Sequence, residues 1–319
     1  MIAVIADDIT GANDIGSMFA KNHLKTDILF DPSYLERYQS GETEVLIADT
    51  DSRFDKSEDA YQKVFETTKA MEALGAEKYF NKTCSVFRGN IGAEFDAMLD
   101  ALNEEFAVII LGFPKNGRET INGIHYVHGR ELAQSEFRND PLHPMYSSSL
   151  EEILRSQTER KVGLINYGTV RRGAVELKNE LIRQKESCQY VIVDVINQHD
   201  LEMIAEAVKD FKILCGSSAI AEELPRFLER TEDTQTLQLP ETRNGGILMI
   251  AGSLMPQTRK QIDYMNNKAD VIQLEALQLL EKESRNDMIM ELTKLISIII
   301  KITRMFCFVL RIALMKSRK

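Results

Sequence analysis

The stretch Ile2-Ala-Val-Ile-Ala-Asp-Asp-Ile-Thr-Gly-Ala-Asn-Asp14 decides the fold class of this chain. A short apolar run is followed at once by two aspartates, a Thr-Gly pair and the beginning of a helical pattern. Continuous apolar runs of this kind are typical of strands that are covered on both faces, as in a parallel sheet. The sequence therefore predicts a buried strand, a polar loop and a helix, which together begin a βαβ unit.

The same succession recurs along the chain. Further strands are predicted at Val45–Ala48, Lys78–Phe80, Ala107–Leu111, Lys161–Ile165, Tyr190–Val195, Phe211–Cys215 and Gly246–Ala251. Apolar residues three and four positions apart predict helices at Glu58–Leu74, Glu94–Leu102, Gly173–Gln184 and Leu201–Val208. We therefore expect an α/β protein with a mostly parallel sheet, whose ligand binds beyond the carboxyl ends of the strands.

The composition is that of an ordinary globular protein. The 319 residues are 44% hydrophobic and 28% charged, and the net charge is -10. This length predicts two domains or one large domain. The negative charge disfavours binding to nucleic acid or to anionic membranes, so a small-molecule partner is expected. The four cysteines form no Cys-x-x-Cys pair, and the start lacks the basic region of a secretory signal, so the expected location is the cytoplasm.

The end of the chain differs in composition from the rest. No acid follows Glu291, whereas seven Lys and Arg residues do, and no glycine follows Gly252. An interruption of the periodicity predicts a boundary between a domain at residues 1–230 and a second domain at residues 246–319. The apolar segment Leu295–Leu314 contains three basic residues, so it is a poor membrane-spanning helix and no membrane partner is expected.

Charged residues follow three successive predicted strands. Asp7 and Asp8 follow the first, Arg53 comes after the second, and the loop Lys82–Ser85 follows the third. A carboxylate can accept a hydroxyl proton or bind Mg²⁺, and Arg and Lys attract anions, Arg by a two-pronged contact. Each residue also has a structural alternative. Asp8 or Thr10 could cap the next helix, and Arg53 could form a structural ion pair with Asp51 or Asp49. Their joint occurrence at successive strand ends favours a site for a small anion.

A tight turn is predicted at Lys115–Thr120, where Asn-Gly is the strongest element. The following Gly123–His128 is expected to form a hairpin or a cover. His125 and His128 have no convincing third ligand in the sequence, so no metal site is expected. Cys84 has no histidine beside it, which disfavours nucleophilic catalysis by its thiol.

In combination, these motifs resemble those of the four-carbon acid sugar kinase family. The segments that carry the resemblance are Ile5–Asp14, Thr50–Arg53, Lys82–Glu94, Phe113–Thr120 and Ala251–Ser253. The resemblance covers roughly residues 1–275. It implies a substrate-binding α/β domain followed by an α/β nucleotide-binding domain, and an enzyme that phosphorylates threonate, erythronate or oxo-tetronate with ATP and Mg²⁺.

The resemblance also implies roles for particular residues. The acid sugar would be bound by Asp8, Arg53, Lys82, Thr83, Cys84 and Ser85, with Arg53 or Lys82 on its carboxylate. Asp8 would accept the proton of the attacking hydroxyl, with Asp7 as the less favoured candidate. Ser253 would make the first nucleotide contact of the second domain. No residue is assigned to a metal, and a homo-oligomer is left open.

Two features depart from the family pattern. Many relatives carry an acid where this chain has Cys84, so substrate choice or pocket polarity is expected to differ. The glycine-rich nucleotide loop is missing, because no glycine follows Gly252. We therefore expect truncation or a shifted reading frame near Leu277–Leu292, an incomplete nucleotide domain with a replacement tail at Ile296–Lys319, and impaired catalysis. The alternatives for the tail are an amphipathic helix packed on the domain and a membrane-surface helix.

Two other functions are weighed against the kinase. One is a noncatalytic acid-sugar binding protein. The other is a Mg²⁺-dependent phosphatase built on Asp7-Asp8-Ile9-Thr10, although haloacid dehalogenase-like enzymes need two aspartates separated by one residue, and these two are adjacent. The kinase is therefore the leading hypothesis.

Overall fold

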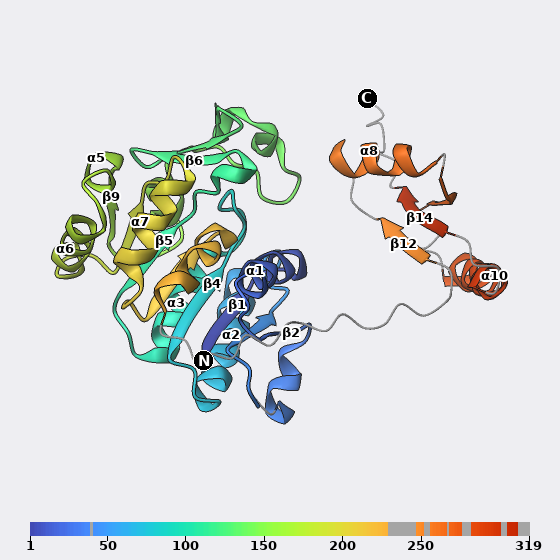
Figure 1. The fold of residues 1–319 in the computed structure, drawn as a ribbon, viewed down its shortest axis with the longest axis horizontal. Helices are drawn as coiled ribbons and strands as arrows, with labels where there is room; N and C mark the ends of the chain where they lie inside the picture. The colour runs from blue at the N-terminus through green and yellow to red at the C-terminus, as the bar shows by residue number, and fades with distance from the viewer. Residues whose placement is uncertain are drawn as a thin grey trace. The chain divides into compact units, whose positions relative to one another are not determined.

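The computed structural model describes residues 1–38, 41–228, 247–251, 256–266, 268–275, 282–300 and 305–311 (Figure 1). The chain divides into two compact units, Met1–Thr236 and Leu237–Lys319. The interrupted stretch at Glu229–Gly245, on which the predicted domain boundary rests, lies outside the described residues.

The first unit is built on an eight-stranded sheet in the order β2-β3-β1-β4-β11-β5-β10-β9, and every neighbouring pair is parallel. Its strands are β1 (Ile2–Ala6), β2 (Thr26–Leu29), β3 (Val45–Asp49), β4 (Lys78–Lys82), β5 (Ala107–Ile110), β9 (Val162–Ile165), β10 (Tyr190–Val193) and β11 (Ile213–Gly216). The predicted α/β class with a mostly parallel sheet is confirmed. The edge strand β2 was not predicted, because it is only partly buried and lacks a continuous apolar run.

Helices cover both faces of this sheet. One face carries α1 (Ile9–Lys21), α6 (Ala174–Lys185) and α7 (Gln198–Val208), and the other carries α2 (Ser57–Ala73), α3 (Ile91–Leu102) and α4 (Leu150–Arg155). Along β1, Val4 and Ala6 pack in the first layer, while Ala3 and Ile5 pack in the second. This two-sided burial explains why β1 is apolar at every position. The short helices are η1 (Pro32–Arg37), α5 (Tyr167–Val170), η5 (Ser218–Glu222) and η6 (Leu224–Phe227).

A small antiparallel sheet follows β5, with β6 (Arg118–Ile121), β7 (Ile124–Val127) and β8 (Arg130–Glu131), accompanied by η2 (Pro114–Asn116), η3 (Leu132–Gln134) and η4 (Glu136–Asn139). The predicted tight turn is present, because η2 ends at Gly117 with a φ of +63°. The predicted hairpin is also present. Its turn is a second Asn-Gly pair, Asn122-Gly123, in which both residues have positive φ and so match the twist of the strands.

The second unit contains a parallel sheet in the order β12-β14-β13. Its elements are β12 (Ile247–Ala251), α8 (Pro256–Met265), β13 (Asp270–Glu275), α10 (Lys282–Ile300) and β14 (Met305–Arg311). In the described part of the ending that follows Glu291, α10 continues to Ile300 and β14 forms the central strand of this sheet. Among the residues that the structure describes, no helix is long and apolar enough to cross a membrane.

Candidate active site

The strands β3, β1 and β4 are neighbours in the sheet and end at the same edge. Ala6, the last residue of β1, lies opposite Asp49 of β3 and Lys82 of β4. Because the three strands are parallel, the loops that follow them leave the sheet side by side. The structure therefore brings together the residues that the sequence placed at three separate strand ends.

The guanidinium group of Arg53 joins these loops. Its Nε and Nη2 atoms donate to the two carboxylate oxygens of Asp7, each at 2.7 Å, and its Nη1 atom donates to Asp8. Burial would lower the pKa of Arg53, but the charge and hydrogen bonds of Asp7 outweigh burial and the pKa is raised. The two-pronged edge of Arg53 is thus occupied by Asp7.

Asp8 has two structural partners and is still partly open. Its Oδ1 atom caps α1 by accepting the backbone N–H of Gly11 at 2.6 Å, and its Oδ2 atom accepts from Arg53. The side chain of Asp8 is 22% exposed, whereas that of Asp7 is 1% exposed. The capping alternative is therefore realised, and Asp8 is the more accessible of the two carboxylates.

Lys82 lies beside Asp8 at the N-terminus of α1. Its ammonium group is buried and has one hydrogen bond within the described chain, to the carbonyl of Thr83 at 3.0 Å. A Cβ atom on Gly11 would lie 2.7 Å from Asp8 Oδ1 and 2.9 Å from Lys82 Nζ. Gly11 is therefore the residue that lets a carboxylate and an ammonium group approach the same turn.

The rest of the Lys82–Ser85 loop is buried and partly unpaired. The hydroxyl group of Thr83 has no hydrogen-bond partner within the described chain. Cys84 Sγ accepts from Arg88 Nε at 3.4 Å, and the carbonyl of Ser85 accepts from His125 Nε2 at 3.0 Å. His125 lies on β7 and is fully buried, and burial lowers its pKa to about 3. His125 therefore attaches the small sheet to this loop.

Sequence reasoning did not assign a role to Glu94, in the first turn of α3. Its carboxyl group is buried and accepts from Ser52 Oγ at 2.8 Å. Burial, reinforced by the charge of Asp7, raises the pKa of Glu94 well above its usual value. Nearby, the Asn90 side-chain amide donates to the carbonyls of Ser52 and Asp55, each at 2.9 Å. The only sequence signal was an acid near a helix start, which usually indicates a solvated position.

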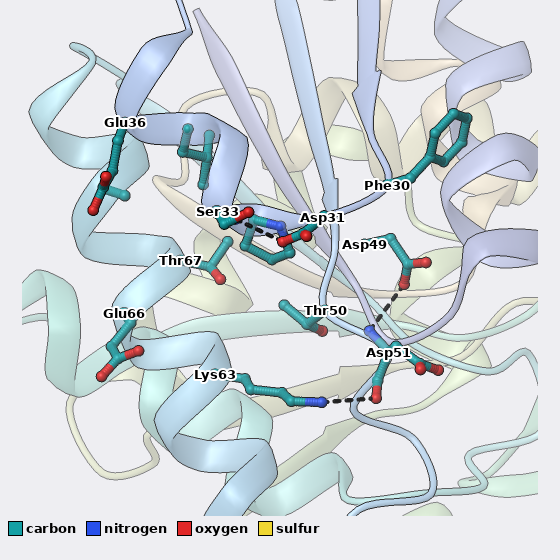
Figure 2. Close-up of a pocket in the computed structure, with 13 residues that line it drawn as sticks. Phe30, Asp31, Ser33, Glu36, Asp49, Thr50, Asp51, Lys63, Glu66 and Thr67 are labelled. Atoms are coloured by element: carbon teal, nitrogen blue, oxygen red, sulfur yellow. Dashed lines mark hydrogen bonds between the residues drawn. The ribbon is translucent and has the colours of Figure 1, made fainter.

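A pocket of about 560 Å³ opens beside this cluster, between η1, the end of β3 and α2 (Figure 2). Its polar lining is mostly acidic and comprises Asp31, Ser33, Glu36, Asp49, Thr50, Asp51, Lys63, Glu66 and Thr67. Burial raises the pKa of Asp49. None of Asp8, Arg53 and Lys82 lines this pocket. The acidic lining makes it unsuitable for an anion, so it is distinct from the predicted acid-sugar site.

Two further predictions concern ligands of the chain. Ser253, the predicted nucleotide contact, lies outside the described residues. Within the residues that are described, no three His, Cys, Asp or Glu side chains are grouped so that they could hold a metal ion.

Comparison with known proteins supports a kinase lineage. Residues 2–224 match the family described as "Sugar-binding N-terminal domain". The chain is 31% identical to a 3-oxo-tetronate kinase of Haemophilus influenzae over 89% of this chain and 69% of the relative. It is 32% identical to a D-threonate kinase of Salmonella typhimurium, over 89% of this chain and 66% of that relative. It is also 32% identical to a D-erythronate kinase of Heliobacterium modesticaldum, over 83% of this chain and 60% of that relative.

The fold also matches solved structures of bacterial proteins. A Salmonella typhimurium protein superimposes with a TM-score of 0.84 at 26% identity, over 98% of this chain and 74% of that protein. A Haemophilus influenzae protein of the DUF1537 family gives a TM-score of 0.76 at 29% identity, over 98% of this chain and 75% of that protein. The sequence matches, the fold and the shared kinase names of the relatives lead to one conclusion: the chain belongs to the four-carbon acid sugar kinase family.

Proposed function

We propose that this chain is an ATP-dependent kinase that phosphorylates a hydroxyl group of a four-carbon acid sugar of the threonate, erythronate or oxo-tetronate type. The observation that carries the proposal is the meeting of Asp8, Arg53 and Lys82 at the ends of β1, β3 and β4, in a chain that belongs to this family. Carboxylate and cation side by side are what a reaction between a hydroxyl group and a phosphoryl group requires.

Asp8 is proposed to accept the proton of the attacking hydroxyl group. Each of its oxygens holds one donor, from Gly11 or Arg53, and so keeps a lone pair for a further hydrogen bond. Asp7 is less suitable, because both of its oxygens face Arg53 and its side chain is almost fully buried. Arg53 is therefore proposed to hold the two aspartates in position at the edge of the bound sugar.

The Lys82–Ser85 loop is proposed to hold the acid sugar. Lys82 supplies a positive charge beside Asp8, and the unpaired hydroxyl group of Thr83 is available to a sugar hydroxyl. In phosphoryl transfer, Mg²⁺ bound to ATP neutralises charge on the phosphates. We assign no described residue of this chain to that ion.

The proposal is tested first by binding. Calorimetry with sodium threonate and sodium erythronate should show binding to the full chain, and a nonhydrolysable ATP analogue should show whether the nucleotide binds as well. ADP release with each acid then measures phosphorylation. A chain that binds none of threonate, erythronate and oxo-tetronate would refute the proposed function.

Asp8→Asn separates the proposed base from general acid-sugar binding. We expect phosphorylation to fall by a factor of about 100 to 10,000, which is typical for loss of a general base, while acid-sugar binding is largely kept. Asp59→Asn is the matched control, because Asp59 is an exposed aspartate on α2. Equal activity of the Asp8 and Asp59 variants would exclude Asp8 as the base.

A further inference from the structure

Arg118, the first residue of β6, is a buried cation with no acidic partner among the residues that the structure describes. It is 6% exposed, and its Nη1 atom donates to the carbonyl of Asn116 at 2.9 Å and to His128 Nε2 at 3.1 Å. Its Nε atom is buried without a hydrogen-bond partner in the described part of the chain, and no bond from Nη2 is found there. No carboxylate among those residues forms an ion pair with Arg118.

Arg53 has the carboxylate partner that Arg118 lacks among the described residues. The Nε and Nη2 atoms of Arg53 form a two-pronged pair with both oxygens of Asp7. The same edge of Arg118 has no partner among the described residues, although both arginine residues are more than nine-tenths buried. Burying a charge and a donor without a partner costs free energy, so such a group in a folded protein needs an explanation, such as a catalytic role or a bound water, ion or ligand.

Arg118 lies on the same side of the small sheet as the substrate loop. Thr120 and His125 share its buried face of β6 and β7, and His125 bonds the carbonyl of Ser85. The guanidinium carbon of Arg118 is 5.7 Å from the centre of the Phe137 ring, and that of Arg88 is 5.0 Å from it.

Arg88 extends this link to Cys84, since its Nε atom contacts the Cys84 sulfur at 3.4 Å. Arg88 already has an acid, because its Nη1 atom pairs with Asp140 at 2.6 Å. Burial lowers the pKa of Arg118, and the charge of Glu136 opposes that shift. Within the described part of the chain, Arg118 is therefore an arginine close to the predicted substrate loop that forms no ion pair.

We propose that the Nε and Nη2 edge of Arg118 binds the carboxylate of the acid sugar and makes Arg118 a specificity-determining residue. This inference rests on the proposed function. The planar fork of Arg matches the two oxygens of a carboxylate, whereas Lys82 can offer only a point charge. Lys82 then stays beside Asp8, near the hydroxyl group that reacts.

The test compares acids with polyols of the same carbon chain. Calorimetry on the full chain measures the dissociation constants of threonate and of uncharged threitol for wild type, Arg118→Gln and Arg118→Lys. We expect Arg118→Gln to weaken threonate binding by roughly tenfold to a hundredfold, because two hydrogen bonds to a charged group are lost. Threitol binding should change little, and Arg118→Lys should restore only part of the threonate affinity.

Two controls separate a ligand contact from a structural role. Arg130→Gln changes an exposed arginine of the same small sheet and should leave threonate binding as in wild type. Thermal unfolding of the free Arg118→Gln protein should show at most a small drop in Tm, since an unpaired buried charge is removed.

Each result decides the matter. Unchanged threonate affinity in Arg118→Gln, an equal loss for threitol, or a loss that matches a large fall in Tm would overturn the proposal. A larger effect on an ATP analogue than on threonate would assign the edge to a phosphate instead, and would overturn it too. If wild type binds no acid, the proposed function fails first, and this site fails with it.

Discussion

Protonation of His125 should destabilise the folded chain where the small sheet meets the substrate loop. The imidazole is fully buried, and the carbonyl of Ser85, which can only accept, fixes the proton on Nε2. Nδ1 then accepts from the hydroxyl group of Thr120 at 3.1 Å. Both ring nitrogens are therefore satisfied in the neutral form, and a second proton would bring an uncompensated charge into the interior.

The magnitude follows from the lowered pKa of His125, which is about 3 in the folded chain against 6.5 for an ordinary histidine. As the pH falls below 6.5, His125 binds a proton in the unfolded chain but stays neutral in the folded chain. The free energy of unfolding therefore decreases between pH 6.5 and about pH 3. At a pH of about 5 the loss is about 2 kcal/mol, and the full window corresponds to about 5 kcal/mol.

The assay is urea unfolding at several pH values between neutral and acid, followed by far-UV circular dichroism because the chain has no tryptophan. His125→Gln keeps a donor for Ser85 and an acceptor for Thr120 but cannot be protonated, so its stability should fall less with acid than that of wild type. His199→Gln is the control, because the side chain of His199 is 73% exposed.

The reasoning would be refuted by a stability difference between wild type and His125→Gln that stays constant from neutral pH to about pH 5. A nuclear magnetic resonance titration gives an independent check. The His125 ring resonance should not shift above pH 5, and a shift near 6.5 would show an accessible imidazole instead of a buried one.

Three further predictions concern the cluster at the strand ends. Glu94→Gln should be neutral or stabilising at neutral pH. The raised pKa keeps the carboxyl group of Glu94 protonated above pH 4.5 in the folded chain, so the stability of wild type should fall as the pH rises from there. Equal pH profiles of stability for the variant and wild type would contradict this. Asp7→Asn should lower the unfolding free energy by roughly 3 kcal/mol in urea titrations, since Arg53 loses its buried charged partner, and a loss near zero would show that Asp8 alone suffices. Gly89→Ala should lower the free energy of unfolding by about 1 to 3 kcal/mol and weaken threonate binding, because the φ of Gly89 is +105° and a Cβ would lie 3.0 Å from Arg53 Cγ. Gly75 also has a positive φ, but a Cβ there would have no atom within 4 Å, so Gly75→Ala should affect stability alone.

The sequence alone determined the fold class and the position of Asp8, Arg53 and Lys82 just after predicted strands. Runs such as Ile2–Ala6 and Tyr190–Val195 are apolar throughout, and only a strand covered on both faces buries every position of such a run. Half-exposed strands such as Thr26–Leu29 carry no such signal, which is why that edge was missed.

Only the tertiary structure decided how the charges pair. The sequence placed Asp8, Arg53 and Lys82 at strand ends, but the order β3-β1-β4 is what makes those ends adjacent. The tertiary structure also showed that Asp7 pairs with the Nε and Nη2 edge of Arg53 and that Glu94 is buried. The equivalent edge of Arg118 has no partner among the described residues. Periodicity reports which residues face a core, whereas the partner of a charged group depends on contacts between residues far apart in the chain. The physical reason is that burial and charge act through space, so a carboxylate or guanidinium acquires its chemistry only when the strands are assembled.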